Sequence, residues 1–285
     1  MRQARVPTPR LRFANFGLGA NFSSERDAGL VDYHGGLMRI ENKRGNYSFL
    51  KGIAPYSAGA VASSDHEIEH ARFRSPLPLR AGFDAVERHL REVGRPKQAL
   101  CGMELRSPKP FTFQGFADFN GGYVDVLKKW DVLLDGLNPV ARTNVAPELE
   151  PPAEPSLYGF SYTVPSKGAP PTLVVAGAGE LPEGSLDPKD VVRRGDTSPA
   201  GLAAKARFVM DLMEGRLHDL GAGWPDVTVA EIYCVHSVCS FLRKEVLTRM
   251  GAASLHGAIW HFARPPIVTI EYEMDLRGCR REFVL

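Results

Sequence analysis

The chain repeats one order of predicted elements, and this duplication constrains its fold more than any other feature. Each half reads strand, helix, strand, helix, strand. Apolar residues recur at helical spacing over residues 79–94 in the first half and over residues 199–221 in the second. Each of these helices ends on a glycine, Gly94 or Gly221, as helices commonly do. A repeat of this size predicts a duplicated domain rather than a solenoid, whose repeats are several times shorter.

The last predicted strand, residues 267–276, alternates most sharply between apolar and polar side chains. One face would carry Val268, Ile270, Tyr272, Met274 and Leu276, and the other Thr269, Glu271, Glu273 and Asp275. Such a pattern is typical of a strand with one solvated face. Other strands are expected at 99–107, 156–164, 172–179 and 227–235, and further helices at 116–134 and 240–251.

The segment PSKGAPP, residues 165–171, is the best candidate for a linker, because prolines flank a flexible Lys-Gly pair. It predicts two domains, residues 1–165 and 166–285, and a chain of 285 residues is long enough for both.

Composition excludes several classes of protein. The formal charge is only +2 with acids and bases interspersed, so nucleic acid is not an expected partner. Cys101, Cys234, Cys239 and Cys279 form no CxxC pair and are too few for a disulfide framework. The first residues lack an apolar signal segment, and no stretch approaches the ~20 apolar residues needed to cross a bilayer. We therefore expect a soluble cytoplasmic protein with no membrane partner.

Five short motifs, taken in order, resemble the Rid (YjgF-type) family. The first half carries KGIAP (51–55) at the place of the family's SGQIP turn, FADFNGGY (116–123) at its F-x-x-x-N-x-x-Y helix, and PVARTNV (139–145) at its arginine strand. The second half carries AGELP (178–182) at the turn and IEYE (270–273) at the closing strand. The resemblance runs from roughly residue 46 to residue 277.

The resemblance implies an α+β fold like that of small chorismate mutases, present here as two tandem domains. Each domain would be a mixed β-sheet backed by two helices. Three such units would join into a barrel-like trimer with active sites between units. A homo-oligomer, most simply a homotrimer, is expected on the same ground.

In that family an arginine binds the substrate carboxylate and a glutamate on the closing strand positions the attacking water. Arg142 matches the arginine, and its planar fork suits a carboxylate. Glu271 matches the glutamate, as a general base or acid. Each half keeps only one member of the pair: Tyr158 stands near the missing glutamate's place, and His256 at the missing arginine's place. These three residues, Glu271, His256 and Tyr158, are the candidate catalytic groups.

The candidate substrate-binding residues are Arg142, Asn120, Asn144, Gly52 and Gly179. Asn120 matches the helix asparagine of the family, and the two glycines match a turn whose backbone approaches a ligand closely. Each has an ordinary alternative: a surface arginine paired with a nearby glutamate, a solvated helix asparagine, and simple tight turns. His256 could bind an anion or shuttle a proton, as could the nearby His236 and His261, although lone histidines are usually structural.

Residues 66–70, His-Glu-Ile-Glu-His, satisfy the H-E-x-x-H zinc pattern. That pattern needs a sustained helix, but Pro76 and Pro78 follow closely and the preceding AGAVASSD is typical of a turn. We expect a solvated charged loop here, with no metal and no organic cofactor.

The expected activity is hydrolytic deamination of a small carboxylate-bearing enamine or imine, similar to aminoacrylate or an aminomuconate. The chemistry needs only a positioned water, because the imine is already an electrophile. Two alternatives stay open. One is a hydrolase similar to chorismatases, which also pair a degenerate half with a half bearing the glutamate. The other is a ligand-binding or regulatory protein that has lost catalysis.

Overall fold

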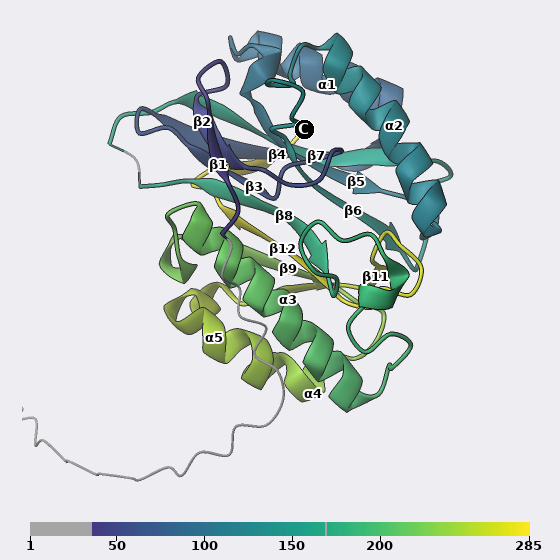
Figure 1. Ribbon diagram of the computed structural model, residues 1–285. Helices are drawn as coiled ribbons and strands as arrows, with labels where there is room; N and C mark the ends of the chain where they lie inside the picture. The colour runs from purple at the N-terminus through teal and green to yellow at the C-terminus, as the bar shows by residue number, and fades with distance from the viewer. Residues whose placement is uncertain (1–35, 169) are drawn as a thin grey trace, which may run out of the picture. The chain divides into compact units, whose positions relative to one another are not determined.

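A computed structural model describes residues 36–168 and 170–285 of the chain (Figure 1). Two mixed β-sheets lie face to face. The seven-stranded sheet has the order β1 (Arg39–Asn42), β2 (Tyr47–Leu50), β3 (Gly59–Ala62), β8 (Leu173–Gly179), β12 (Glu273–Gly278), β9 (Val229–Tyr233) and β10 (Ile259–His261). The six-stranded sheet has the order β11 (Ala263–Arg264), β6 (Ala141–Pro147), β5 (Leu100–Arg106), β7 (Ser156–Pro165), β4 (His66–Pro78) and β13 (Glu282–Val284).

Helices cover the outer face of each sheet (Figure 1). Helices α1 (Leu79–Glu92) and α2 (Phe113–Lys129) lie on the six-stranded sheet. Helix α3 (Pro199–Asp219) lies on the seven-stranded sheet, together with the short α4 (Cys239–Phe241), a π-helical segment Leu242–Leu247, and α5 (Thr248–Met250). The result is four layers: helices, sheet, sheet, helices.

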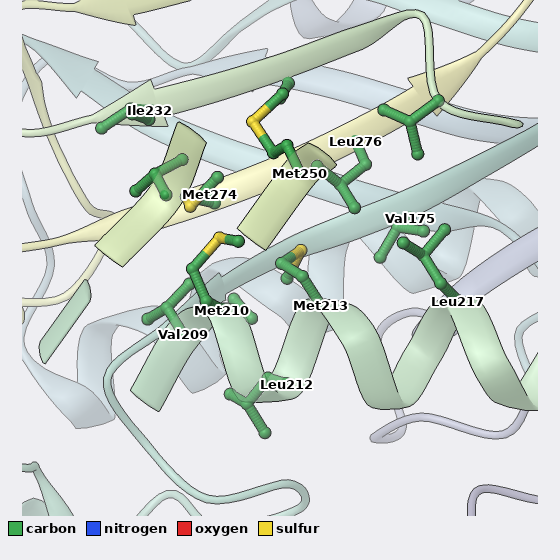
Figure 2. Close-up of a cluster of buried hydrophobic side chains, with 14 of the residues drawn as sticks. Val175, Val209, Met210, Leu212, Met213, Leu217, Ile232, Met250, Met274 and Leu276 are labelled. Carbon is green, nitrogen blue, oxygen red and sulfur yellow. The ribbon is translucent and has the colours of Figure 1, made fainter. Parts of the chain in front are cut away.

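The larger core lies between α3 and the seven-stranded sheet. Figure 2 shows Met210, Met213 and Leu217 of α3 packed toward Val175 of β8 and Leu276 of β12. All five are buried. Burying one such side chain contributes about 1.5–3 kcal/mol, so this contact fixes α3 against β8 and β12, two of the strands that carry the site described below.

The space between the sheets holds charged side chains among apolar ones. Arg277 of β12 lies there, and its Nη1 donates to Glu104 Oε1 at 2.5 Å and to Glu231 Oε2 at 3.0 Å. Glu273 and Asp275, on the same face of β12, are also buried. The prediction that this face is solvated is therefore wrong: β12 is central in its sheet and is covered on both faces.

The two halves exchange strands. Strands β1, β2 and β3 of the first half extend the sheet that contains β8, β12 and β9 of the second half. In return β13 pairs in parallel with β4, and β11 pairs with β6. The predicted fold class, two tandem chorismate-mutase-like Rid domains in a trimeric barrel, is therefore corrected to two stacked mixed sheets built from both halves. The division at residue 165 and a homo-oligomer remain predictions.

Several local predictions are confirmed, and others are wrong at their ends. Helix α1 begins at Leu79 as expected, and Gly94 follows it with φ +69°. Helix α2 ends at Lys129 rather than near residue 134, because the chain turns at Asp131 with φ +56°. The closing strand begins only at Glu273, after a turn in which Thr269 has φ +78°. Within the described ranges, no helix is both long and apolar enough to cross a bilayer.

Residues 66–70 form the start of β4, not the expected charged loop, and Glu67, Glu69 and His70 are buried. In a strand, residues four apart are separated by about 13 Å along the chain. His66 and His70 therefore cannot share a zinc ion as they would on a helix. His70 Nδ1 instead lies 2.9 Å from Ser161 Oγ.

Candidate active site

A pocket lies where β6, β8 and β12 come together near the start of α2. The pocket opens to solvent, and the centre of a water molecule can reach about 80 Å³ of it. Both sheets contribute to it. Its lining includes Arg142 and Asn144 of β6, Gly177 and Gly179 of β8, Glu273 of β12, Arg216 of α3, and Gly52, Tyr56 and Glu183 from loops.

Arg142 is the most unusual side chain of the pocket. It is 2% exposed, yet none of its three guanidinium nitrogens has a hydrogen-bond partner among the described residues. Aromatic rings surround it, with the Tyr56 and Tyr123 centroids 4.6 and 4.8 Å from Cζ and Phe116 at 5.4 Å. The rings stabilise the cation but satisfy none of its N–H groups. Because buried donors are almost always paired in proteins, this guanidinium is suited to bind an anion.

Asn144 adds a further donor on the same face of β6, two residues from Arg142. Its Oδ1 accepts a hydrogen bond from Ser107 Oγ at 2.9 Å. Its Nδ2 is buried and, in the part of the chain that the structure describes, unpaired. Arg142 and Asn144 together form an arrangement suited to a carboxylate, whose two oxygens can accept from both residues.

Glu273 brings a carboxyl group to the same pocket. It is 4% exposed and is the first residue of β12. Burial, aided by the negative charge of Glu180, raises the pKa of Glu273 to about 8, while Arg216 and Arg142 oppose the rise. A carboxyl group with a pKa near neutrality can both give and take a proton, which is what general acid–base catalysis requires.

The wall beside Glu273 carries a second arginine. Arg216 donates from Nε to Glu183 Oε1 at 2.5 Å and from Nη2 to Glu183 Oε2 at 3.0 Å. Its Nη1 donates to the backbone oxygen of Ala176 at 2.8 Å. This bidentate ion pair holds the loop that bears Glu183 in place beside the pocket.

Four of the predicted site residues are brought together: Arg142, Asn144, Gly52 and Gly179 all line the pocket. The other four lie outside its lining. Glu271 faces His236, whose Nε2 is 2.9 Å from Glu271 Oε2. Tyr158 lies under the guanidinium of Arg106, 4.0 Å from Cζ to the ring centre. Asn120 is buried on α2, and His256 is an exposed residue at the end of a 3₁₀ turn.

Sequence reasoning missed Glu273, Arg216 and Tyr56. Glu273 lies two residues after Glu271 on the same alternating face, so the pattern alone gave no reason to choose it. Arg216 falls in the helical repeat of α3, and its position opposite β8 depends on how that helix packs. The predicted roles of the eight residues remain predictions, since the geometry gives their places and not their activity.

A possible metal site lies outside this pocket. Glu104, Glu231 and Asp275 have oxygens within 4.8 Å of one another between the sheets. The guanidinium of Arg277 already contacts Glu104 and Glu231, and Thr143 Oγ1 donates to Asp275 Oδ2 at 2.5 Å. A cation in this cluster would repel Arg277, so these residues are better described as an internal ion-pair network.

Comparison with known proteins assigns the family. The family model described as 2-aminomuconate deaminase CnbZ matches residues 39–283, and the chain belongs to this family. One relative, the 2-amino-5-chloromuconate deaminase of Comamonas testosteroni, is 46% identical over 244 residues, which cover 85% of this chain and 96% of that protein. The assignment to the Rid family, made from short motifs, is therefore wrong.

Two solved structures are distantly similar. A crystal structure of a chorismatase has a TM-score of 0.44 at 12% identity and covers 78% of this chain and 77% of its own. A cyanuric acid hydrolase from A. caulinodans has a TM-score of 0.35 at 9% identity, with coverage of 75% and 66%. Both scores are too low to indicate a shared activity.

Proposed function

We propose that the protein is a hydrolytic deaminase of a 2-aminomuconate-like dicarboxylate. The observation that carries the proposal is the buried, unpaired guanidinium of Arg142 in a pocket that also holds Glu273. Membership of the 2-aminomuconate deaminase CnbZ family supports it, as does the 46% identity to a 2-amino-5-chloromuconate deaminase.

Arg142 and Asn144 would hold the substrate by the carboxylate next to its amino-bearing carbon. A bidentate contact from the guanidinium fixes the plane of that carboxylate. The amino-bearing carbon is bonded directly to the carboxylate carbon, so the same contact fixes the position of the reacting carbon. Desolvation lowers the pKa of Arg142, and a bound carboxylate would favour the charged form again.

Glu273 would move the protons. The protonated carboxyl group gives its proton to a carbon of the dienamine, which becomes an iminium ion. The resulting carboxylate then takes a proton from a water molecule as the water oxygen adds to the iminium carbon. Glu273 then gives this proton to the amino group and takes the hydroxyl proton as the carbinolamine collapses, which breaks the C–N bond, releases ammonia and leaves an oxo group. The net reaction is amine plus water to ketone plus ammonia, with no redox change.

The direct test is ammonia release from freshly generated 2-aminomuconate by the purified protein, followed with the decay of the diene absorbance. Parallel reactions with the 5-chloro compound would show whether the chlorine is accepted. We expect stoichiometric ammonia with the wild-type protein and little with Arg142→Lys. Binding of the dicarboxylate without ammonia release would contradict the proposal and favour a ligand-binding protein.

A further inference from the structure

An ion pair lies behind the pocket with both side chains fully enclosed. Lys205 of α3 donates from Nζ to Glu180 Oε1 at 2.8 Å, and both side chains are 0% exposed. Glu180 directly follows the last residue of β8. Neither residue lines the pocket, and the proposed chemistry uses neither of them.

The Glu180 carboxylate binds the backbone just before Glu273. Its Oε1 accepts from the amide of Glu271 at 2.8 Å, and its Oε2 from the amide of Tyr272 at 3.0 Å. The pairing of β8 with β12 stops at Gly179 and Glu273. Past that point the Glu180 side chain replaces the missing strand, and it satisfies two amides that would otherwise have no acceptor.

Lys205 connects Glu180 to the far end of the loop that forms another wall of the pocket. Its Nζ also donates to the backbone oxygen of Val192 at 3.0 Å, and the amide of Val192 donates to the backbone oxygen of Glu180 at 2.9 Å. The loop between residues 180 and 192 is thereby closed at its base. Six consecutive residues of the pocket lining, 181–186, belong to this loop.

Stability alone gives little reason to keep such a pair. Removing two charges from water is costly, and well-packed apolar residues of similar volume are often as stabilising. What apolar residues could not do is accept from the amides of Glu271 and Tyr272. The pair therefore fixes the backbone of residues 271–272, directly before Glu273.

We propose that Glu180 and Lys205 are a positioning pair for Glu273: the carboxylate holds residues 271–272, and thereby aims the Glu273 carboxyl group into the pocket. The inference rests on the proposed function, in which Glu273 transfers protons. Glu180 and Lys205 act through Glu273 and touch no substrate.

The pair also contributes to the electrostatic surroundings of Glu273. Burial is the main cause of the raised pKa of Glu273, and the charge of Glu180 is the next largest. The other charged or titratable groups that face Glu273 come from α3, β6, β5 and a loop: Arg216, Arg142, Arg106 and Tyr56. Neutralising Glu180 should lower the pKa of Glu273, because Glu180 is the largest charge that raises it.

The test uses the double variant Glu180→Gln/Lys205→Met, which keeps the volumes and leaves no buried charge unpaired. We expect it to fold, and to lose about ten-fold or more in kcat with little change in KM, since Arg142 and Asn144 are untouched. The pH profile of kcat should move to lower pH. The matched control is Arg207→Met/Glu245→Gln, which removes a pair between α3 and the π-helical segment, away from the pocket. It should leave kcat and the profile unchanged.

A second measurement does not depend on activity. Infrared titration of the carboxyl band, taken as wild type minus Glu273→Gln, reports the pKa of Glu273 directly. If wild type releases no ammonia, the proposed function fails, but a lower Glu273 pKa in the double variant still shows that the pair acts on Glu273. A folded double variant with unchanged kcat, pH profile and carboxyl titration would overturn the inference.

Discussion

The carboxylate of Glu273 lies directly over Gly177, so that a Cβ at position 177 would collide with Glu273 Oε1. The two residues are on neighbouring strands, β12 and β8, and both line the pocket. Gly177 is thus needed for the space it leaves and not for a special backbone angle. Any side chain there would displace the carboxyl group that we assign to proton transfer.

The first prediction follows from this contact. Gly177→Ala should lower kcat by about ten-fold or more, because a displacement of the reacting group of even 1 Å can cost as much as a hundred-fold. The free energy of unfolding of Gly177→Ala should differ from that of wild type by less than a large-to-small substitution in the core would cause. The control is Gly121→Ala on α2, where an added Cβ meets nothing within 4 Å and should stabilise the helix slightly. Steady-state kinetics and urea unfolding of both variants test this prediction. Normal turnover by Gly177→Ala would contradict the assignment of Glu273 to proton transfer.

Arg142→Lys should be severely impaired although it keeps the positive charge. Lysine cannot form two parallel bonds to a carboxylate, and loss of a charge-assisted hydrogen bond typically costs about 1.5–3 kcal/mol, or roughly ten- to a hundred-fold in kcat/KM. Arg264→Lys is the matched control, since Arg264 pairs with Glu148 at the surface and such pairs contribute little. Turnover by Arg142→Lys close to that of wild type would end the carboxylate-anchor hypothesis.

The two glutamates of IEYE give a third prediction. Glu273→Gln should reduce kcat by about a hundred-fold or more, within the range of general acid–base contributions. Glu271→Gln should stay within a few-fold of wild type, because Glu271 faces His236 outside the pocket. The reverse order of effects would indicate that Glu271, and not Glu273, transfers the protons.

If Arg142 and Glu273 form one composite site, their losses in Arg142→Lys/Glu273→Gln should overlap rather than add. Arg142 comes from the first half of the chain and Glu273 from the second, so steady-state kinetics of the double variant test whether the two halves share one site; additive losses would contradict it.

Much of the local structure could be predicted from the sequence. Helices α1 and α3 and strands β5, β7 and β8 follow from periodicity and glycine stops, because these signals act within one turn of helix or a few residues of strand. Four of the eight candidate site residues, Arg142, Asn144, Gly52 and Gly179, meet in one pocket, and their roles remain predictions.

The rest depends on contacts between distant segments. No local pattern indicates that β3 pairs with β8 across more than a hundred residues, and that pairing is what removes the simple tandem arrangement. For a similar reason, no local pattern could show that Glu273 lines the pocket while Glu271 lies outside its lining. Alternation identified the polar face of β12 but could not show that a second sheet covers it.

The last prediction concerns the stability of the folded protein against pH. The pKa of Glu273 is raised from 4.5 to about 8 in the folded state. Between these values the folded protein keeps the proton while the unfolded chain has lost it, so the unfolded state binds fewer protons and the free energy of unfolding falls as pH rises. Each pKa unit corresponds to ~1.4 kcal/mol, so the total is at most a few kcal/mol. Glu273→Gln abolishes this titration. Relative to wild type, it should therefore gain stability steadily between about pH 5 and pH 8, and the difference should level off at higher pH. Urea unfolding of both proteins at pH 5, 7 and 9 measures it, because titrations common to the two proteins cancel in the difference. A difference that stays constant over this range would show that the Glu273 carboxyl group has an ordinary pKa and is not the buried acid of the proposed mechanism.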